Sequence, residues 1–512
     1  MKRSLLPVVI LLALSVSMGT VMGSSSNAQD PTTFKTDRLE SQANGVIAET
    51  IQLTPIDANN WRHPAIGEDS RGNRLAIFRG PEGTIYYYAY CPKNGAWSAP
   101  MPINDGAQPR LGDSLYANMV VDSNDRFHCT WEEADGNRGG QVYASFKNGV
   151  WTTPMKWDIY GRYDLISSAL GVRSDDTVVT ADCEVIGFSK DIFLHTKGKN
   201  DAEFSAPFNV TRDEKPGSTQ PCLAIDAEDN TWLVWKSDLL LPDVDENLVI
   251  YLAQFDKNNN DIGDWIRLST SPAWSFVPQV AINNQGRVMT TWAYPHGGDY
   301  VSRFYDPATA TLSEQIHLET GMVRAPWHTF FHRLVSHGKD FYSAVIVPGR
   351  SVPVMKFDET TLKWDEIYRL PEGVEMLGMF AGYDKLLIAW NSWIEPTGVY
   401  LTTIGIDPWM KIRIRSVSNL NVAKIVERSF FKNYVLNALT WTANPENTEK
   451  GITVSFHRIY RKGRSEDDSK WTRIAEVAGT VYSYNDRDIT ADSDYVYAVT
   501  CVDDQEHESK IF

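Results

Sequence analysis

Short apolar runs alternate with polar turns along most of the chain, and one version of this alternation recurs. Residues 221–225 form an apolar run, residues 226–230 a polar turn, and residues 231–235 a second run that ends on Trp. The same order recurs in residues 117–131 and 278–292, and each time nine positions separate the turn-opening Asp or Asn from the Trp. Such a unit buries little surface alone, so its repetition predicts that the copies stack on one another.

Seven copies of this unit can be followed between residues 45 and 406. The other four open at residues 64, 168, 331 and 376, and those at 168 and 331 are eroded. The turns lie 45 to 57 residues apart, and a tyrosine-rich run and an outer strand follow most copies, which fits a blade of four strands. We therefore predict an all-β chain with a seven-bladed β-propeller, and six blades as the alternative.

The number of outer strands suggests how the ring closes. The seventh copy ends near residue 406 without an outer strand, whereas residues 48–54 form an unpaired apolar run directly before the first copy. We predict that this N-terminal strand completes the last blade.

The pattern changes after about residue 408, where short alternating strands follow one another. Apolar alternation covers residues 439–445, 456–462, 471–477 and 495–503, which predicts a β-sandwich of about 90 residues. This part resembles a bacterial fibronectin type III domain, with Trp441 at the position of the family's core Trp and Tyr495 at its tyrosine corner. The resemblance implies a spacer or adhesion module. The predicted organisation is a signal peptide at 1–28, a propeller at 45–406, a linker at 407–430 and a sandwich at 431–512.

The N-terminal segment indicates export. Lys2 and Arg3 precede an apolar run over residues 5–16 and then small residues, as in a secretory signal peptide. No later run is long enough to cross a membrane, so we expect a soluble secreted, periplasmic or cell-surface protein without membrane insertion. Loss of Lys2 and Arg3 takes the net charge from −16 to −18, which disfavours nucleic acid as a partner.

Cysteine spacing and the acidic runs do not predict a cofactor or a metal. The five Cys residues are widely spaced and form no CxxC pair, and the HxxxH pair of His328 and His332 lies in a predicted β context where we do not expect a zinc site. Residues 256–264 begin like a calcium loop, but Asp261 and Arg267 stand where an EF-hand needs Gly and Glu. A hairpin turn is the favoured interpretation, and an ion near Asp256 remains the alternative.

The loops at one end of the predicted strands are rich in Arg, aromatic and acidic residues, whereas the turns at the other end are plain Asp, Asn and Gly turns. Loop residues of this kind bind acidic glycans or peptides. His63, Tyr116, Gln220, Asp182, Glu184 and His332 belong to the same loops. The candidate ligand-binding residues are Arg62, Arg110, Asp113, Arg162, Tyr163, Glu132, Trp274, Arg324, Trp327, His328 and Trp393.

The repeat region resembles sialidase-like propellers with BNR-type repeats in architecture, although their Ser-x-Asp-x-Gly-x-Thr-Trp box is not present. The resemblance implies three Arg on a substrate carboxylate, a Tyr–Glu nucleophile pair and an Asp acid. The arginines would come from Arg62, Arg110, Arg162 and Arg324, the pair from Tyr163 or Tyr116 with Glu132 or Glu133, and the acid from Asp113 or Asp164. A lyase with His63 or His332 as base and Tyr163 as acid fits equally well.

Two functions from different classes follow from these observations. The first is an exported binding protein whose propeller face holds an acidic glycan or an extracellular protein. The alternative is a carbohydrate-active enzyme, either a sialidase-like hydrolase or a polysaccharide lyase. An enzyme needs two carboxylates, or a carboxylate with a Tyr, within about 5 to 9 Å in a pocket.

Overall fold

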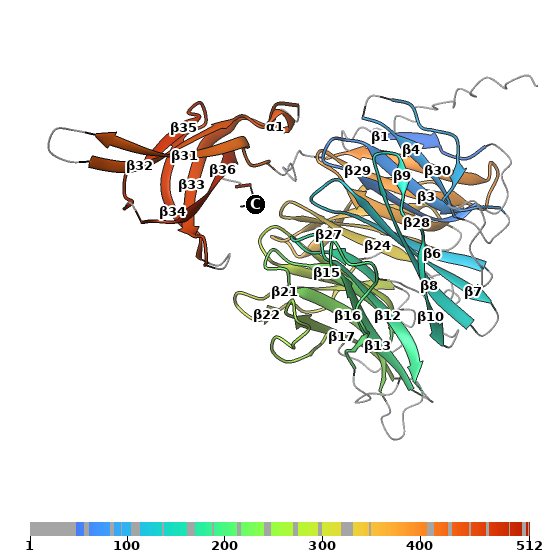
Figure 1. Ribbon diagram of the computed structural model, residues 1–512. Coiled ribbons are helices and arrows are strands. Elements are labelled where there is room, and N and C mark those ends of the chain that lie inside the picture. The colour runs from blue at the N-terminus through green and yellow to red at the C-terminus, as the bar shows by residue number, and fades with distance from the viewer. Residues whose placement is uncertain are drawn as a thin grey trace, which may run out of the picture. The chain divides into compact units, whose positions relative to one another are not determined.

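The described part of the chain is nearly all β (Figure 1). The computed structural model describes residues 48–511, apart from 56–60, 82–85, 94, 104–112, 136–137, 161–168, 187–188, 212–216, 240–246, 270–274, 295–298, 319–330, 348–349, 407–413, 429–432, 450–451, 467–469, 491, 504–507 and 510. The helix α1 (Pro445–Glu449) interrupts an otherwise β chain. Within these ranges, no helix has the length and apolar character needed to cross a membrane.

Seven antiparallel sheets of four or five strands occupy the described residues up to 406. Each of the seven predicted copies forms the first two strands of one sheet, the eroded copies included. In chain order the strands are β2 (Arg62–Glu68), β3 (Arg74–Arg79), β4 (Tyr86–Cys91) and β5 (Met101–Pro102); β6 (Asp113–Val121), β7 (Phe127–Asp135), β8 (Arg138–Lys147), β9 (Val150–Trp151) and β10 (Met155–Tyr160); β11 (Ala169–Val172), β12 (Val178–Ile186), β13 (Ser189–Lys197) and β14 (Phe208–Asn209); β15 (Thr219–Ile225), β16 (Thr231–Leu239), β17 (Asn247–Phe255) and β18 (Ile266–Arg267); β19 (Phe276–Ile282), β20 (Val288–Tyr294), β21 (Asp299–Asp306), β22 (Thr311–Leu312) and β23 (Ile316–His317); β24 (His332–His337), β25 (Asp340–Val345), β26 (Val352–Asp358) and β27 (Lys363–Leu370); β28 (Val374–Ala381), β29 (Lys385–Ser392) and β30 (Gly398–Gly405).

The first strands of the seven sheets contact one another in a cycle. β2 contacts β6, and the contacts continue through β11, β15, β19, β24 and β28, which in turn contacts β2. Because the cycle returns to its starting strand, the seven sheets surround a common axis.

The N-terminal strand β1 (Ala48–Gln52) completes the last sheet, as predicted. It pairs antiparallel with β30, from Ala48 opposite Ile404 to Gln52 opposite Tyr400. Leu53 follows the strand and packs in a buried cluster with Leu387 and Leu401. The last sheet therefore joins the two ends of the repeat region.

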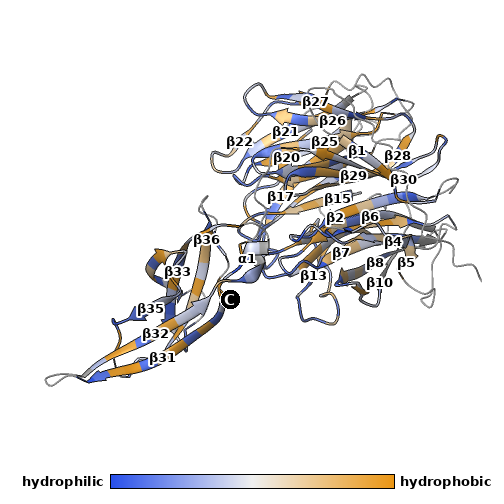
Figure 2. Cartoon of the chain, turned by 90° about the horizontal axis from the view of Figure 1, so that it is seen from above, coloured by the Kyte–Doolittle hydropathy of each residue, from blue (hydrophilic) through white to orange (hydrophobic). Residues whose placement is uncertain are grey.

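The sheets are held together by apolar side chains between them. Figure 2 shows hydrophobic residues spread along the strands of the sheets, with hydrophilic residues frequent at the turns. The three Trp residues that end the clearest copies, Trp131, Trp235 and Trp292, are fully buried. In the turn of the fourth copy, the Asp226 carboxylate accepts hydrogen bonds from the backbone N–H of Asn230 and from the indole N–H of Trp232. In the three clearest copies, the repeat thus marks a buried Trp and a turn that an Asp or Asn side chain hydrogen-bonds.

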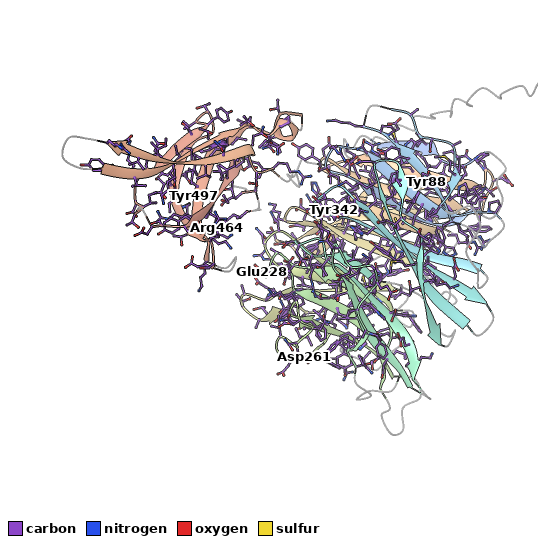
Figure 3. All side chains as sticks on the ribbon, in the orientation of Figure 1. Tyr88, Glu228, Asp261, Tyr342, Arg464 and Tyr497 are labelled. Atoms are coloured by element: carbon purple, nitrogen blue, oxygen red, sulfur yellow. The ribbon has the colours of Figure 1, made fainter. Side chains whose placement is uncertain are left out.

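The C-terminal residues form two three-stranded antiparallel sheets. One has the order β31 (Ser418–Arg428), β32 (Asn433–Thr442), β35 (Ser483–Asp486), and the other β34 (Thr472–Ala478), β33 (Val454–Gly463), β36 (Tyr495–Asp503). β31 begins inside the range expected as linker. Trp441 lies in the buried cluster of this part. Tyr497, which is labelled in Figure 3, donates a hydrogen bond of 2.8 Å from its hydroxyl to Asp486. Of the two tyrosines on β36, Tyr497 is the one that hydrogen-bonds Asp486, and Tyr495, expected at the tyrosine corner, lies two residues before it.

Candidate active site

Four first strands carry a β-bulge at the same place near their beginning. The bulged residues have a left-handed backbone although none is Gly: His63 (φ 51°), Tyr116 (φ 38°), Gln220 (φ 58°) and Val277 (φ 49°). Such a residue costs on the order of 1–3 kcal/mol, and strain of this kind clusters at functional sites. Bulges also redirect side chains. Their recurrence identifies this end of the ring as the place to look for a site.

His63 and Tyr116 contact each other at this end. Their ring centroids lie 5.0 Å apart with the planes at 71°, an edge-to-face contact between β2 and β6. His63 is 7% exposed, and its Nδ1 is buried without a hydrogen-bond partner among the described residues. The centroid of the Tyr116 ring also lies 5.7 Å from that of the Phe331 ring.

The surroundings of His63 favour its neutral form. Burial lowers its pKa to about 3, and the charges of Arg79, Arg62 and Arg333 act in the same direction. The imidazole is therefore unprotonated at neutral pH and can accept a proton.

The surroundings of Tyr116 favour its protonated form. Burial raises the pKa of the phenol, and the carboxylates of Glu132 and Glu375 raise it further when they are ionised. Glu132 itself is 1% exposed, and burial followed by the charge of Asp182 raises its pKa well above the usual range. Tyr116 thus keeps its proton at neutral pH and can give it to a strongly basic oxygen, whereas Glu132 is poorly suited to remove a proton.

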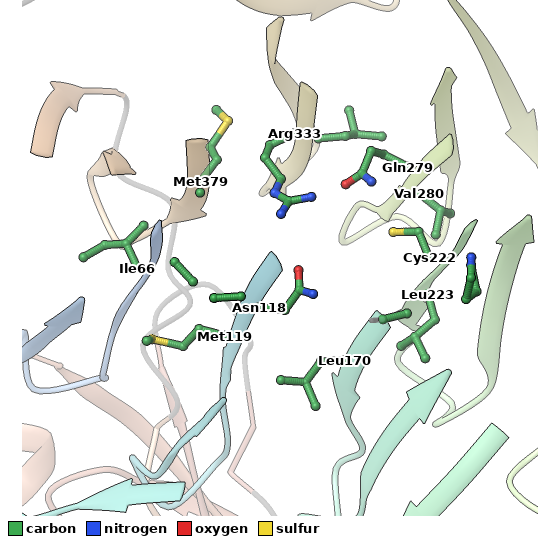
Figure 4. A pocket seen from close by; sticks show the side chains of 16 residues that line it. Ile66, Asn118, Met119, Leu170, Cys222, Leu223, Gln279, Val280, Arg333 and Met379 are labelled. Carbon is green, nitrogen blue, oxygen red and sulfur yellow. The ribbon is translucent and has the colours of Figure 1, made fainter. Parts of the chain in front are cut away.

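The register of the first two strands places seven residues in one layer around the axis of the ring. They are Ala65, Asn118, Ala169, Cys222, Gln279, Arg333 and Gly378. All of them line a cavity of ≈ 130 Å³ to which every first strand contributes. Arg333 is the charged member of this layer, and Figure 4 shows its guanidinium pointing into the cavity toward the carboxamides of Asn118 and Gln279.

The arginines near His63 differ in their partners. Arg333 forms no ion pair with any residue that the structure describes, and burial lowers its pKa. Arg62 pairs with Glu375, with Nη1 3.1 Å from Oε1, and both side chains are partly exposed. A guanidinium that lies in a cavity without a carboxylate favours an anionic ligand.

The structure brings some of the predicted residues together. Arg62 lowers the pKa of His63, and Glu132 raises the pKa of Tyr116. Trp393 lies in the turn after β29 and is 59% exposed. Asp113 is the first residue of β6 and stands opposite Ala134. The other predicted residues lie outside the described ranges: Arg110, Arg162, Tyr163, Trp274, Arg324, Trp327 and His328.

Sequence reasoning missed Arg333, although a signal for it exists. The residue stands in an eroded copy, at the position where the other six copies have Ala, Asn, Cys, Gln or Gly. An Arg among small and neutral residues at a repeated position marks a departure from the scaffold pattern.

His332 is the alternative base that the sequence predicts for a lyase. Its Nε2 lies 2.8 Å from the hydroxyl of Thr291, and its ring packs edge to face on Tyr300. Burial lowers its pKa to about 3. These contacts fit a role in the packing between sheets better than contact with a ligand.

The expected turn at Asp256 is hydrogen-bonded within the chain. Its Oδ1 accepts the backbone N–H groups of Asn258 and Asn260, each at 2.8 Å. This is the pattern of the other turns of the repeat.

A separate group on the third sheet, Asp182, Glu184 and His195, has the donor atoms that a metal ion needs.

Comparison with known proteins finds weakly similar solved structures and no family. The sequence matches no protein-family model and no curated protein. Among solved structures, a protein of unknown function from Dyadobacter fermentans is 10% identical, with a TM-score of 0.42 over 70% of this chain and 98% of that one. The polysaccharide lyase Uly1 is 9% identical, with a TM-score of 0.43 over 68% of this chain and 91% of that one. The GH93 α-L-arabinofuranosidase of Fusarium graminearum is 9% identical, with a TM-score of 0.42 over 69% of this chain and 96% of that one. Similarity at this level does not transfer an activity.

Proposed function

We propose that the seven sheets are the blades of a β-propeller and that its bulged end cleaves an acidic glycan by β-elimination. The contact between His63 and Tyr116 carries this proposal, because it joins a neutral imidazole to a protonated phenol. The cyclic contact of the first strands supports seven blades. We also propose that the C-terminal sheets are a fibronectin type III sandwich that spaces or docks the exported protein.

β-Elimination in a uronate polymer needs a base, an acid and positive charge. The base removes the proton on the carbon next to the carboxylate, and the bond between the following carbon and the glycosidic oxygen breaks. The acid then protonates this oxygen, so one fragment gains a C=C bond and the other a free hydroxyl. Positive charge at the carboxylate stabilises the enolate that develops.

His63 is proposed as the base. In the unliganded site, burial and then the charges of three arginines lower its pKa. A substrate carboxylate bound by Arg62 and Arg333 would offset their charges, and the imidazole would become more basic only when substrate is present. Its pKa would then move toward neutral pH, where a general base works best.

Tyr116 is proposed as the acid. Its raised pKa keeps the proton on the phenol until the leaving oxygen develops negative charge. The sialidase-like alternative needs a carboxylate that activates this tyrosine. Glu132 is fully buried and favours its protonated form, so it fits that role less well.

Arg333 and Arg62 are proposed to bind the carboxylate. Arg333 has no acidic partner among the described residues, and Arg62 would exchange Glu375 for the substrate. A guanidinium binds a carboxylate in two-point fashion, and partial burial strengthens the contact.

The test uses a panel of uronate polysaccharides and follows the ultraviolet absorbance of the unsaturated product. His63→Gln and Tyr116→Phe should each lower turnover by about 10²–10⁴-fold, the usual contribution of a general acid or base. Tyr434→Phe is the control, because Tyr434 is half exposed on β32. Reducing ends without an unsaturated product would contradict elimination and favour hydrolysis.

A non-catalytic glycan-binding role is the second candidate, and exposed aromatic surface favours it. Trp393 and Ile394 are 59% and 41% exposed on one turn, and an indole face stacks well on a sugar ring. If no polymer is cleaved but Trp393→Ala abolishes retention on a glycan column, this candidate replaces the first.

A further inference from the structure

The third sheet carries three metal-binding side chains on one face. Asp182 and Glu184 are two residues apart on β12, so their side chains point to the same side of the sheet. His195 on β13 stands opposite Thr180, which shares that side. The Nε2 of His195 lies 3.2 Å from Oδ2 of Asp182 and 3.7 Å from Oε1 of Glu184.

The three donor atoms nearly have the spacing of a metal site. All lie within 4.8 Å of one another. Around a tetrahedral zinc ion with bonds of about 2.0–2.2 Å, donor atoms stand about 3.4 Å apart. The cluster therefore needs to contract by no more than about 1.4 Å, a change that side-chain rotation supplies.

The second contact of the His195 ring also fits a metal ligand. The imidazole hydrogen-bonds the backbone of Ser205 in addition to its contact with Asp182. Imidazoles that bind a metal through one nitrogen commonly use the other on a backbone carbonyl or a carboxylate, which fixes the ring.

The charges of the cluster favour a cation. Two carboxylates face one imidazole, with Asp182 1% and His195 5% exposed. Asp182 also acts electrostatically on the buried Glu132 of the neighbouring sheet. A protonated His195 offsets one negative charge, whereas a divalent ion offsets both carboxylates and leaves the imidazole neutral.

We propose that Asp182, Glu184 and His195 bind one divalent transition-metal ion. One imidazole nitrogen and two carboxylate oxygens suit Zn²⁺ or Mn²⁺. Three protein ligands leave a coordination position for water or another ligand. This inference does not depend on the proposed elimination reaction.

The experiment is calorimetric titration of the full chain, treated with a chelator and dialysed, with Zn²⁺ and separately with Mn²⁺. We expect one equivalent to bind. His195→Ala and Glu184→Gln should each weaken binding by at least about 100-fold, since even outer-shell substitutions cost 10–100-fold. Glu184 is partly exposed, so its variant tests the site even if His195→Ala fails to fold. His317→Ala, at an exposed position of β23, is the control and should bind normally.

Binding of Co²⁺ gives a second readout, because its visible absorption reports the ligand set and should change in Glu184→Gln. Absence of binding by the parent chain would overturn the proposal and leave His195 and Asp182 as an ion pair. Unchanged binding in both variants would also overturn it, because the ion would then lie elsewhere.

Discussion

His63 and Tyr116 meet edge to face across two neighbouring sheets, and each is held in a left-handed backbone at the bulge of its strand. Neither sheet positions the pair alone. The pair therefore depends on the ring that fixes β2 against β6, and on the strand β1 that completes the last sheet of this ring.

The first prediction concerns the N-terminal strand. Deletion of residues 1–54 removes β1 from β30 and removes Leu53 from its buried cluster. Each buried aliphatic side chain contributes about 1.5–3 kcal/mol, so the melting temperature should fall by many degrees. Deletion of residues 1–46 is the matched control, because it leaves β1 in place. Equal melting temperatures for both truncations would contradict a closing role for this strand.

The second prediction concerns Arg333. Replacement by Met keeps much of the side-chain volume but removes the charge, so binding of a uronate oligosaccharide should weaken by at least about tenfold. Binding by the parent should also weaken with salt, because the partly exposed Arg62 contributes to binding and exposed charges are screened within about 8 Å at physiological ionic strength. Calorimetry at two salt concentrations measures both effects. Arg464→Met is the control, since Arg464 lies on the surface of the C-terminal part. Equal affinity of Arg333→Met and the parent would exclude Arg333 from the site.

The third prediction is a loss of stability in acid. His63 and His332 have folded-state pKa values of about 3, lowered by burial from 6.5. The unfolded chain therefore binds more protons between these values, and stability should fall as the pH drops from about 6.5 toward 3. Each histidine contributes up to about 1.4 kcal/mol per pH unit in this window.

The corresponding measurement is the free energy of unfolding by urea at pH 7 and pH 4.5. His63→Gln and His332→Gln should each reduce the difference between the two values by roughly 2 kcal/mol. His317→Gln serves as the comparison at an exposed position. If the pH dependence of all three variants equals that of the parent, neither buried histidine titrates as described.

The fourth prediction concerns the turn of the fourth copy. Oδ1 of Asp226 accepts the backbone N–H groups of Glu228 and Asn230, and Oδ2 accepts from the Trp232 indole at 3.0 Å. Asp226→Ala leaves these donors without a partner and should cost about 2–3 kcal/mol of stability. Glu228→Ala in the same exposed turn should change stability by less than about 0.5 kcal/mol. A similar effect of both variants in urea unfolding would show that the carboxylate does not organise the turn.

The sequence located the site only in part. It identified the loops that contain His63, Tyr116 and Glu132, because polar and aromatic residues gather at one end of the predicted strands. It did not reveal that His63 meets Tyr116, because they are 53 positions apart on different sheets and either could face another loop. Arg333 was missed because an Arg inside a strand pattern usually reaches solvent, and only the ring places this one in a cavity.

What the sequence determined by itself is the local unit: two apolar strands, an Asp or Asn turn and a Trp that becomes buried. This follows from short-range physics, since alternation fixes the face of a strand and an Asx side chain fixes its own turn. The tertiary structure alone decided that the seven equivalent positions converge on the axis, and which charges act on which acid or base. Protonation states depend on burial and on charges from other sheets, so the states of His63 and Tyr116 exist only once the ring is closed.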